Sequence, residues 1–211
     1  MSANSKIEWT EKVWNPVTGC TEVSPGCDHC YAKVFAERFR GVPGHPFERG
    51  FDLQLRPERL KDPFRWRKPQ RVFVNSMSDL FHRDVPDSFI EQVYATMLDA
   101  SLCPYRHTFQ VLTKRPERMR RIVPPIYEKA GAIYRDGKAY TDGIWSGVSI
   151  ESNPFAWRAD MLREVPGIRW ISAEPLLGPL DRVDFTGMAW VVIGGESGHG
   201  ARDRRPHAGD R

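Results

Sequence analysis

Short apolar runs alternate with amphipathic segments along most of this 211-residue chain. The last run, Ala189–Ile193, is apolar at every position, whereas Pro86–Ser101 places its apolar residues on one helical stripe. Because strand-like and helix-like segments take turns, the pattern favours a parallel sheet covered by helices. We therefore expect an α/β protein, built as an open or partial β/α barrel of about six parallel strands.

The predicted elements are short and lie between turn residues. The strands are expected over Val13–Thr18, Phe51–Leu55, Arg71–Asn75, His107–Leu112, Ile144–Ser149, Ile168–Ala173 and Ala189–Ile193. The helices are expected over Tyr31–Arg40, Pro57–Trp66, Pro86–Ser101, Arg115–Ile122 and Asn153–Glu164. The polar stretch Pro124–Gly143 is typical of an insertion between a helix and the next strand.

The composition fits a single domain. A hydrophobic content of 40% is enough for a sizeable core, which we place within residues 1–200. The formal charge of +4 is mildly basic and does not by itself indicate nucleic acid. Nothing in Met1–Glu11 resembles a signal peptide, and no apolar run approaches the roughly 18 residues of a membrane-spanning helix. We expect a cytoplasmic protein in a reducing compartment, without a membrane partner.

Polar residues and glycines recur where the predicted strands end. In a β/α barrel the carboxyl ends of the strands open on a common mouth, where sites are built. Each of these residues alone could simply cap a strand or form a turn, but their recurrence at five consecutive strand ends favours a shared site. The residues are Asn75, Ser76, Asp79, Thr113, Lys114, Arg115, Ser149, Glu151, Glu174, Gly194, Gly195, Glu196 and Ser197.

Three of the four cysteines, Cys20, Cys27 and Cys30, fall within eleven residues with Cys-x6-Cys-x2-Cys spacing. Thiolates are soft ligands for zinc, copper(I) or iron–sulfur clusters, and the Pro25–Gly26 bend can return Cys20 to the close pair. A structural zinc site normally takes four protein ligands, and no second cysteine pair follows. His29 is an awkward fourth ligand because it lies inside the turn. The pattern favours a cubane cluster with one open iron; a zinc knuckle and ordinary buried thiols are the alternatives.

Several segments resemble a phage and prophage family of unknown function that is marked by a three-cysteine motif. They are Lys6–Thr10, Trp14–Cys20, Cys27–Ala32, Phe73–His82, Leu112–Pro116, Ser172–Leu176 and Gly194–Gly198. That family is similar to radical S-adenosylmethionine (SAM) enzymes, distantly to those of the spore-photoproduct-lyase kind. The cysteine spacing departs from the Cys-x3-Cys-x2-Cys that is common among them. The resemblance implies a [4Fe-4S] cluster, SAM and a radical-SAM-like barrel, but no particular substrate.

The resemblance also implies roles at the strand ends. The three cysteines would hold the cluster, and SAM would chelate the open iron through its amino and carboxylate groups. The candidates for contacts with SAM are Ser76 and Asp79 for the amino group, Lys114 for the carboxylate, and Ser149, Glu151 and Glu174 for the ribose hydroxyls. Charge-assisted hydrogen bonds favour such pairings. The Gly194–Gly195 pair, followed by Glu196, would let the backbone approach a ligand closely, although a bare tight turn also explains it.

The chemistry implied is reductive SAM cleavage and hydrogen abstraction from an unidentified substrate, for which we hypothesise a nucleobase or nucleotide. The competing class is a non-enzymatic zinc- or nucleic-acid-binding module that uses the three-cysteine motif. Its surface would be a basic cluster that could contact phosphates, although a solvated helix face is the more usual explanation of such a run. The cluster comprises Lys114, Arg115, Arg118, Arg120 and Arg121.

Three further features have mainly structural interpretations. Cys103 stands alone beside a proline, and we expect it to pack. His82 is expected in a polar loop, with a catalytic role as the alternative. Ser88 with Glu91 has capping-box spacing at the start of a helix, and Asp87 is an equally good cap.

The C-terminal segment lacks a regular pattern. Residues 201–211 are charged and show no helix or strand pattern, whereas members of the resembled family continue with a further helix and strand. A shortened C-terminus would leave the strand Ala189–Ile193 as an uncovered edge, and unpaired edges promote association. We therefore expect self-association through this edge.

Overall fold

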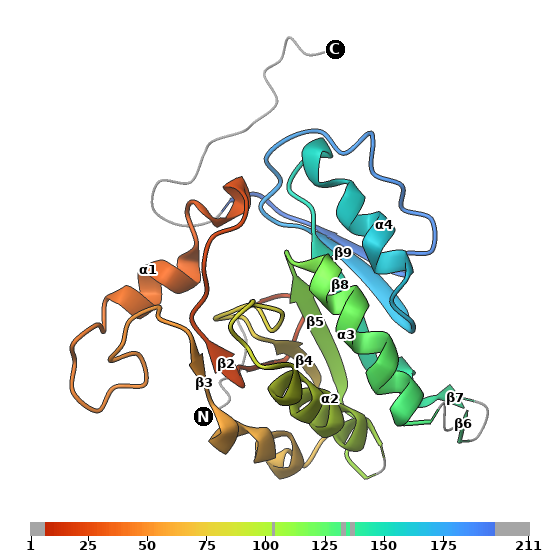
Figure 1. Ribbon diagram of the computed structural model, residues 1–211, viewed down its shortest axis with the longest axis horizontal. Helices are drawn as coiled ribbons and strands as arrows, with labels where there is room; N and C mark the ends of the chain where they lie inside the picture. The colour runs from red at the N-terminus through yellow and green to blue at the C-terminus, as the bar shows by residue number, and fades with distance from the viewer. Residues whose placement is uncertain (1–6, 103, 132–133, 136–137, 197–211) are drawn as a thin grey trace.

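A six-stranded parallel sheet forms the centre of the protein (Figure 1). The computed structural model describes residues 7–102, 104–131, 134–135 and 138–196. Every neighbouring pair in the sheet runs parallel, and the two outer strands do not pair with each other, so the barrel is open. The strands, in spatial order, are β1 (Lys12–Trp14), β4 (Arg71–Val74), β5 (Thr108–Thr113), β8 (Ile144–Ser149), β9 (Ile168–Ala173) and β10 (Trp190–Ile193). The predicted partial barrel is confirmed.

Helices cover one face of this sheet, and a separate arm carries the cysteines (Figure 1). The arm contains a short antiparallel pair, the η1 turn and helix α1. The α-helices are α1 (Tyr31–Glu37), α2 (Asp87–Ser101), α3 (Pro116–Lys129) and α4 (Trp157–Arg163). The remaining strands are β2 (Val17–Thr18), β3 (Gln54–Leu55), β6 (Tyr134–Arg135) and β7 (Lys138–Ala139). The 3-10 turns are η1 (Pro25–Cys27), η2 (Pro57–Lys61), η3 (Pro63–Arg65), η4 (Tyr140–Gly143) and η5 (Asn153–Phe155).

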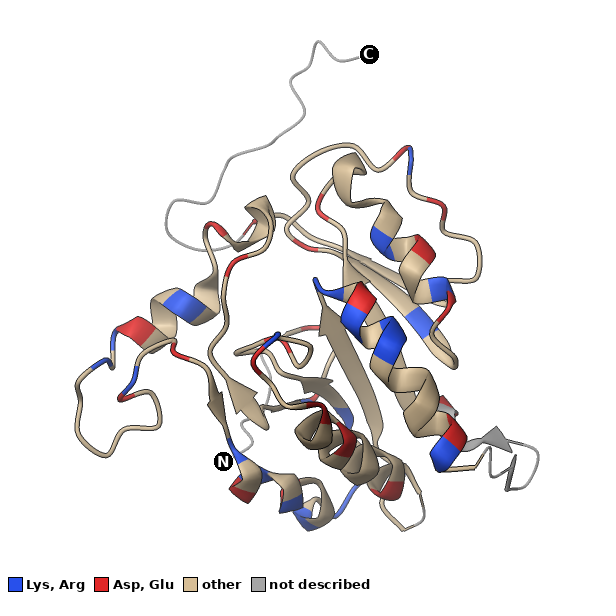
Figure 2. Ribbon diagram, viewed as in Figure 1, with Lys and Arg blue, Asp and Glu red and all other residues tan. Residues whose placement is uncertain are grey.

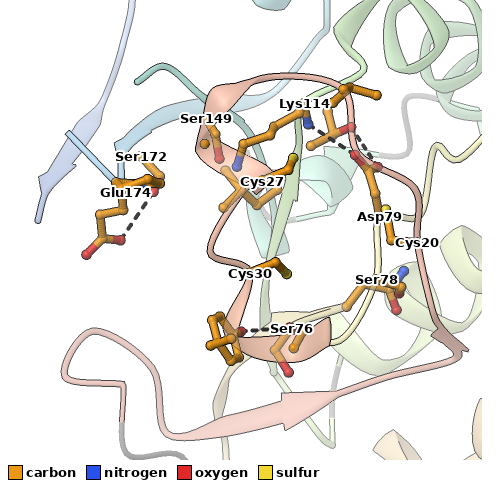
Figure 3. A pocket seen from close by; sticks show the side chains of 18 of the residues that line it. Cys20, Cys27, Cys30, Ser76, Ser78, Asp79, Lys114, Ser149, Ser172 and Glu174 are labelled. Atoms are coloured by element: carbon orange, nitrogen blue, oxygen red, sulfur yellow. Dashed lines mark hydrogen bonds between the residues drawn. The ribbon is translucent and has the colours of Figure 1, made fainter. Parts of the chain in front are cut away.

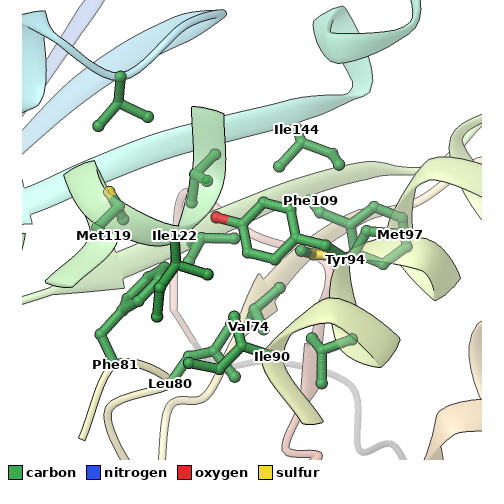
Figure 4. Packing of buried hydrophobic residues seen from close by; sticks show 14 of the residues in the cluster. Val74, Leu80, Phe81, Ile90, Tyr94, Met97, Phe109, Met119, Ile122 and Ile144 are labelled. Carbon is green, nitrogen blue, oxygen red and sulfur yellow. The ribbon is translucent and has the colours of Figure 1, made fainter. Parts of the chain in front are cut away.

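The helix-facing side of the sheet supplies the main core. Side chains alternate along a strand, so Val72 and Val74 of β4 and Phe109 of β5 point towards the helices. They pack with Ile90, Tyr94 and Met97 of α2 and with Met119 of α3, all of them buried (Figure 4). Burial of this apolar stripe holds α2 on the sheet, at about 1.5–3 kcal/mol for each large side chain.

The opposite face of the sheet carries aromatic rings. Trp9, from the segment before β1, makes edge contacts with Phe73 and Trp170 at ring-centroid distances of 4.8 and 5.3 Å. Trp170 stacks in turn on Trp190, at 5.2 Å. A Cβ on Gly147 would lie 2.4 Å from the Trp170 ring, so the glycine is required for this ring to cross the neighbouring strand. The four rings thus form one aromatic cluster on this face of the sheet.

Prolines caused the main errors in the predicted elements. The helix expected to end at Ile122 runs on to Lys129 through Pro124 and Pro125. Each proline removes one backbone hydrogen bond, but the buried side chains of Val123 and Ile126 hold the helix on the core. The predicted insertion is correspondingly shorter. Conversely, the helix expected over Pro57–Trp66 breaks into η2 and η3, because a second proline, Pro63, interrupts it.

Two local expectations were also wrong. The predicted strand Phe51–Leu55 is reduced to β3, which pairs with β2 outside the main sheet. The predicted cap of α2 is absent: Pro86 occupies the cap position without a side-chain bond, and the Asp87 carboxylate pairs with arginines of α3 instead. The strands predicted over Ile144–Ser149 and Ile168–Ala173 are confirmed to the residue.

Strand β10 lies at one edge of the sheet, as an uncovered last strand requires. Its residues are at most half-buried, and Ile193 is 65% exposed. The tail 201–211 lies outside the described residues, so self-association through this edge stays a prediction. No helix in the part of the chain that the structure describes could cross a membrane.

Candidate functional site

A cavity of about 470 Å³ lies between the cysteine arm and the carboxyl ends of the central strands (Figure 3). All three motif cysteines line it, together with most of the predicted strand-end residues. The predicted residues in its wall are Cys20, Cys27, Cys30, Asn75, Ser76, Asp79, Thr113, Lys114, Arg115, Ser149, Glu174, Gly195 and Glu196. Its volume falls within the usual range for a small-molecule site, about 300–1,000 Å³. The expected common mouth at the strand ends therefore exists.

The three cysteines are free thiols that share one wall of the cavity. Cys27 ends the η1 turn, and Cys30 precedes the first residue of α1, so the turn and helix fix the close pair. Cys20 approaches from the end of β2. Within the described residues, no three His, Cys, Asp or Glu side chains are arranged closely enough to hold a metal ion. The donor set, three free and partly exposed thiols on one loop, nonetheless suits a cluster with an open iron.

The Asp79 carboxylate accepts four hydrogen bonds. Its carboxylate accepts hydrogen bonds from the Thr113 hydroxyl at 2.7 Å, the backbone N–H of Phe81 at 2.9 Å, and the backbone N–H of Lys114 at 3.1 Å. Nη1 of Arg115 donates a fourth, at 2.9 Å. Asp79 lines the cavity, but these bonds commit its carboxylate to joining the end of β4 to the end of β5.

Arg115 connects this carboxylate to the cysteine loop. Its Nη1 also lies 3.5 Å from Cys20 Sγ, and its Nη2 donates to the Thr21 carbonyl at 2.8 Å. The Thr21 hydroxyl in turn contacts Nε2 of His82 at 2.8 Å. Because Nδ1 of His82 accepts from the backbone N–H of Asp84, Nε2 carries the proton and donates to Thr21. His82 is thus a neutral anchor of the loop.

Burial shifts the pKa values of two of these groups. The Cys20 thiol has a pKa raised to about 11, first by burial and then by the negative charge of Asp79, while Arg115 opposes the rise. Burial, followed by the charge of Arg115, lowers the pKa of His82. Without a bound metal Cys20 is therefore a protonated thiol at neutral pH, and metal binding there must release its proton.

Glu151 lies beneath the loop and outside the cavity lining. It forms a buried ion pair with Arg158, whose Nη1 is 2.8 Å from Glu151 Oε2 and also donates to the Ser149 carbonyl at 2.7 Å. The other carboxylate oxygen faces the loop: a Cβ on Gly26 would lie 3.1 Å from Oε1. Glu151 therefore supports the loop, and the absence of a side chain at Gly26 lets the loop backbone approach the Glu151 carboxylate.

Some of the remaining predicted residues line the cavity, and others contact only neighbouring parts of the protein. Lys114 extends towards Ser149 and Cys27 (Figure 3), which leaves its ammonium at the cavity. Glu174 faces the cavity and accepts a hydrogen bond from Ser172 at 3.2 Å. Gly194 is absent from the cavity lining, and a Cβ there would lie 2.5 Å from Glu174 Oε1, so the glycine makes room for the Glu174 side chain. Gly195 has open space around it.

A family model for proteins of unknown function, DUF5131, matches residues 4–208 of the chain. The chain belongs to the DUF5131 family. No curated protein matches it in sequence. Among solved structures, a doubly substituted spore photoproduct lyase with bound AdoMet and dinucleoside spore photoproduct superposes with a TM-score of 0.58 at 13% identity, covering 92% of this chain. A singly substituted spore photoproduct lyase gives a TM-score of 0.54, also at 13% identity, covering 90% of this chain. This DUF5131 chain spans 58% of either structure, and the likeness establishes the shared fold.

Arg115 was predicted at the shared mouth as a strand-end residue, and its place in the cavity wall agrees with that prediction. Its membership of the basic cluster suggested a solvated helix face instead, yet its side chain reaches across to Cys20. The partners of Arg115, Cys20 and Asp79, were not predicted. Tyr31 is the residue that the sequence interpretation missed: its hydroxyl donates to the Ser76 carbonyl at 2.7 Å, which ties α1 to the cavity wall.

The other arginines of the basic cluster are paired within the protein. Arg118 and Arg121 both contact Asp87, and Arg120 lies 2.8 Å from a carboxylate oxygen of Glu164. These pairs connect α3 to α2 and to the end of α4. Nucleic-acid binding by this cluster stays a prediction, and any such contact competes with these ion pairs.

Proposed function

We propose that this DUF5131 protein is an iron–sulfur, SAM-dependent radical enzyme. The observation that carries the proposal is the placement of three free cysteines, on one loop, against a cavity at the carboxyl ends of an open parallel sheet. A structural zinc site normally takes four protein ligands, whereas the motif offers three free cysteines. The fold shared with spore photoproduct lyase structures supports the same choice.

The cysteines at positions 20, 27 and 30 would hold a [4Fe-4S] cluster. When bound, and with an electron from an external one-electron donor, the cluster and SAM would supply radical chemistry for hydrogen abstraction from the substrate. The protein's own part is to bind, orient and exclude water. Lys114 offers an ammonium at the cavity for a carboxylate group, and Glu174 offers a carboxylate on the opposite side for hydroxyl or amino groups. Ser76, Ser149 and the open backbone at Gly195 complete the wall.

The proposed substrate is a nucleobase or nucleotide. Trp9, Tyr31, Phe51 and Phe73 line the cavity. Flat aromatic side chains of this kind stack on planar bases, at about 1–3 kcal/mol per base. One of the structurally similar lyases has bound AdoMet and dinucleoside spore photoproduct, which supports the same substrate class here.

Metal analysis tests the proposal. Protein purified without oxygen and reconstituted with iron and sulfide should be brown and carry about four irons and four sulfides per chain. Cys27→Ala should abolish the colour, whereas Cys103→Ala, which alters the cysteine outside the motif, should leave it intact. Colourless protein with one tightly bound zinc would refute the cluster and favour the binding-module alternative.

A further inference from the structure

We propose that the Arg115–Asp79 pair sets the reduction potential of the cluster through Cys20, with Arg115 raising it and Asp79 lowering it. The inference rests on the proposed function and adds a positioning pair that acts on the electron-transfer step. It assigns to Arg115 a role that is distinct from phosphate binding.

The geometry places one cation and one anion beside a single cysteine. Arg115 Nη1 lies between Cys20 Sγ, at 3.5 Å, and Asp79 Oδ2, at 2.9 Å. The Arg115 and Asp79 side chains are only 15% and 9% exposed, so solvent screens their charges poorly. Nη2 holds the Thr21 carbonyl and hydroxyl, at 2.8 and 3.2 Å, which fixes the backbone next to Cys20.

Hydrogen bonds to neighbouring residues hold the Arg115 guanidinium in place. The Thr113 hydroxyl accepts from the Arg115 backbone N–H at 2.8 Å and donates to Asp79 at 2.7 Å, so both charged groups share one anchor at the end of β5. An arginine that is held at its backbone and at both terminal nitrogens keeps its charge in one place. Such fixed hydrogen bonds and charges near cluster sulfurs are what tune iron–sulfur potentials.

The direction of each effect follows from electrostatics. Reduction adds one negative charge to the cluster, which a nearby cation stabilises and a nearby anion destabilises. Removal of the Arg115 charge should therefore make the potential more negative. Removal of the Asp79 charge should make it less negative, because the guanidinium is then left uncompensated. A pair that is merely structural predicts no such opposition of sign.

The test is a redox titration of the reconstituted protein without SAM, followed by the electron paramagnetic resonance signal of the reduced cluster. We expect Arg115→Gln to lower the midpoint and Asp79→Asn to raise it. Arg115→Lys keeps the positive charge but loses the paired terminal nitrogens of the guanidinium. Its midpoint should therefore fall between those of wild type and Arg115→Gln. The matched control is Arg121→Gln, which removes the same charge from α3, the helix that follows Arg115, at a side chain that is 63% exposed. It should leave the midpoint unchanged.

Three outcomes are decisive. Shifts of the same sign in Arg115→Gln and Asp79→Asn, or equal shifts in Arg115→Gln and Arg121→Gln, would overturn the inference while leaving the proposed function standing. Wild-type protein that binds no cluster would overturn both. If Arg115→Gln does not fold, as judged by circular dichroism, the Asp79→Asn midpoint alone decides, because the inference requires it to rise.

Discussion

Removal of Arg158 should destabilise the protein far more than removal of a surface arginine. Its side chain is 2% exposed and that of its partner Glu151 is 1% exposed, with 2.8 Å between the charged atoms. Arg158→Met leaves a carboxylate buried without its counter-charge, which costs about 3–5 kcal/mol. The Ser149 carbonyl also loses a donor. Because domains of this kind are stable by only about 5–15 kcal/mol, the variant should lie close to the limit of folding.

The assay is urea unfolding of the metal-free protein under reducing conditions, followed by circular dichroism. The matched control is Arg120→Met, whose partner is Glu164; these side chains are 41% and 56% exposed. Exposed pairs of this kind contribute about 0–1 kcal/mol. The double variant Arg158→Met/Glu151→Leu removes both charges and should recover most of the lost stability. If Arg158→Met costs no more than Arg120→Met, Glu151 is not held as a buried anion and the reasoning fails.

Two further predictions concern ligand binding and pH. Lys114→Met should weaken SAM binding to the reconstituted protein by about 1.5–3 kcal/mol if its ammonium makes a charged hydrogen bond, whereas Lys129→Met, at the far end of α3, should not; calorimetry measures both, and equal affinities would show that SAM is misplaced. Burial lowers the pKa of His82 and of His107 below the ordinary 6.5, so the unfolded chain binds more protons than the folded one as pH falls through that value. The free energy of unfolding should therefore fall between pH 7 and 5, and His82→Gln should flatten that slope; an unchanged slope would contradict the assignment of a neutral buried ring.

Periodicity predicted the central sheet well, because each of its strands is a short apolar run with a turn on either side. Ile144–Ser149 and Ile168–Ala173 needed no tertiary information. Proline positions were harder to interpret. A proline counts against a helix locally, but α3 buries apolar side chains around Pro124 and Pro125, and burial decides the outcome. That gain depends on neighbours that are distant in sequence.

The composition of the site was predictable, whereas the partners of its residues were not. The expectation that the carboxyl ends of the strands share one mouth placed the cysteines, Lys114 and Glu174 around one cavity, as the structure shows. The same expectation could not distinguish a residue that faces the cavity from one that supports it. Glu151 comes two residues after Ser149, yet only Ser149 reaches the wall, because Arg158 draws the Glu151 carboxylate beneath the loop. Glu151 and Arg158 are separated by the η5 turn, so their pairing leaves no periodic pattern in the sequence.

The distribution of charge around the cavity connects these observations. Lys114 and Arg115, both at the end of β5, lie beside the cysteine loop, whereas Glu174 and Glu196 line the side formed by β9 and β10. Metal binding would convert the three thiols into thiolates, which repel one another, and the two adjacent cations would reduce that repulsion. The acidic side leaves the far wall suited to hydroxyl and amino groups. We therefore expect a ligand that carries a carboxylate at one end and such groups at the other to bind in one orientation, with its carboxylate next to the cysteines.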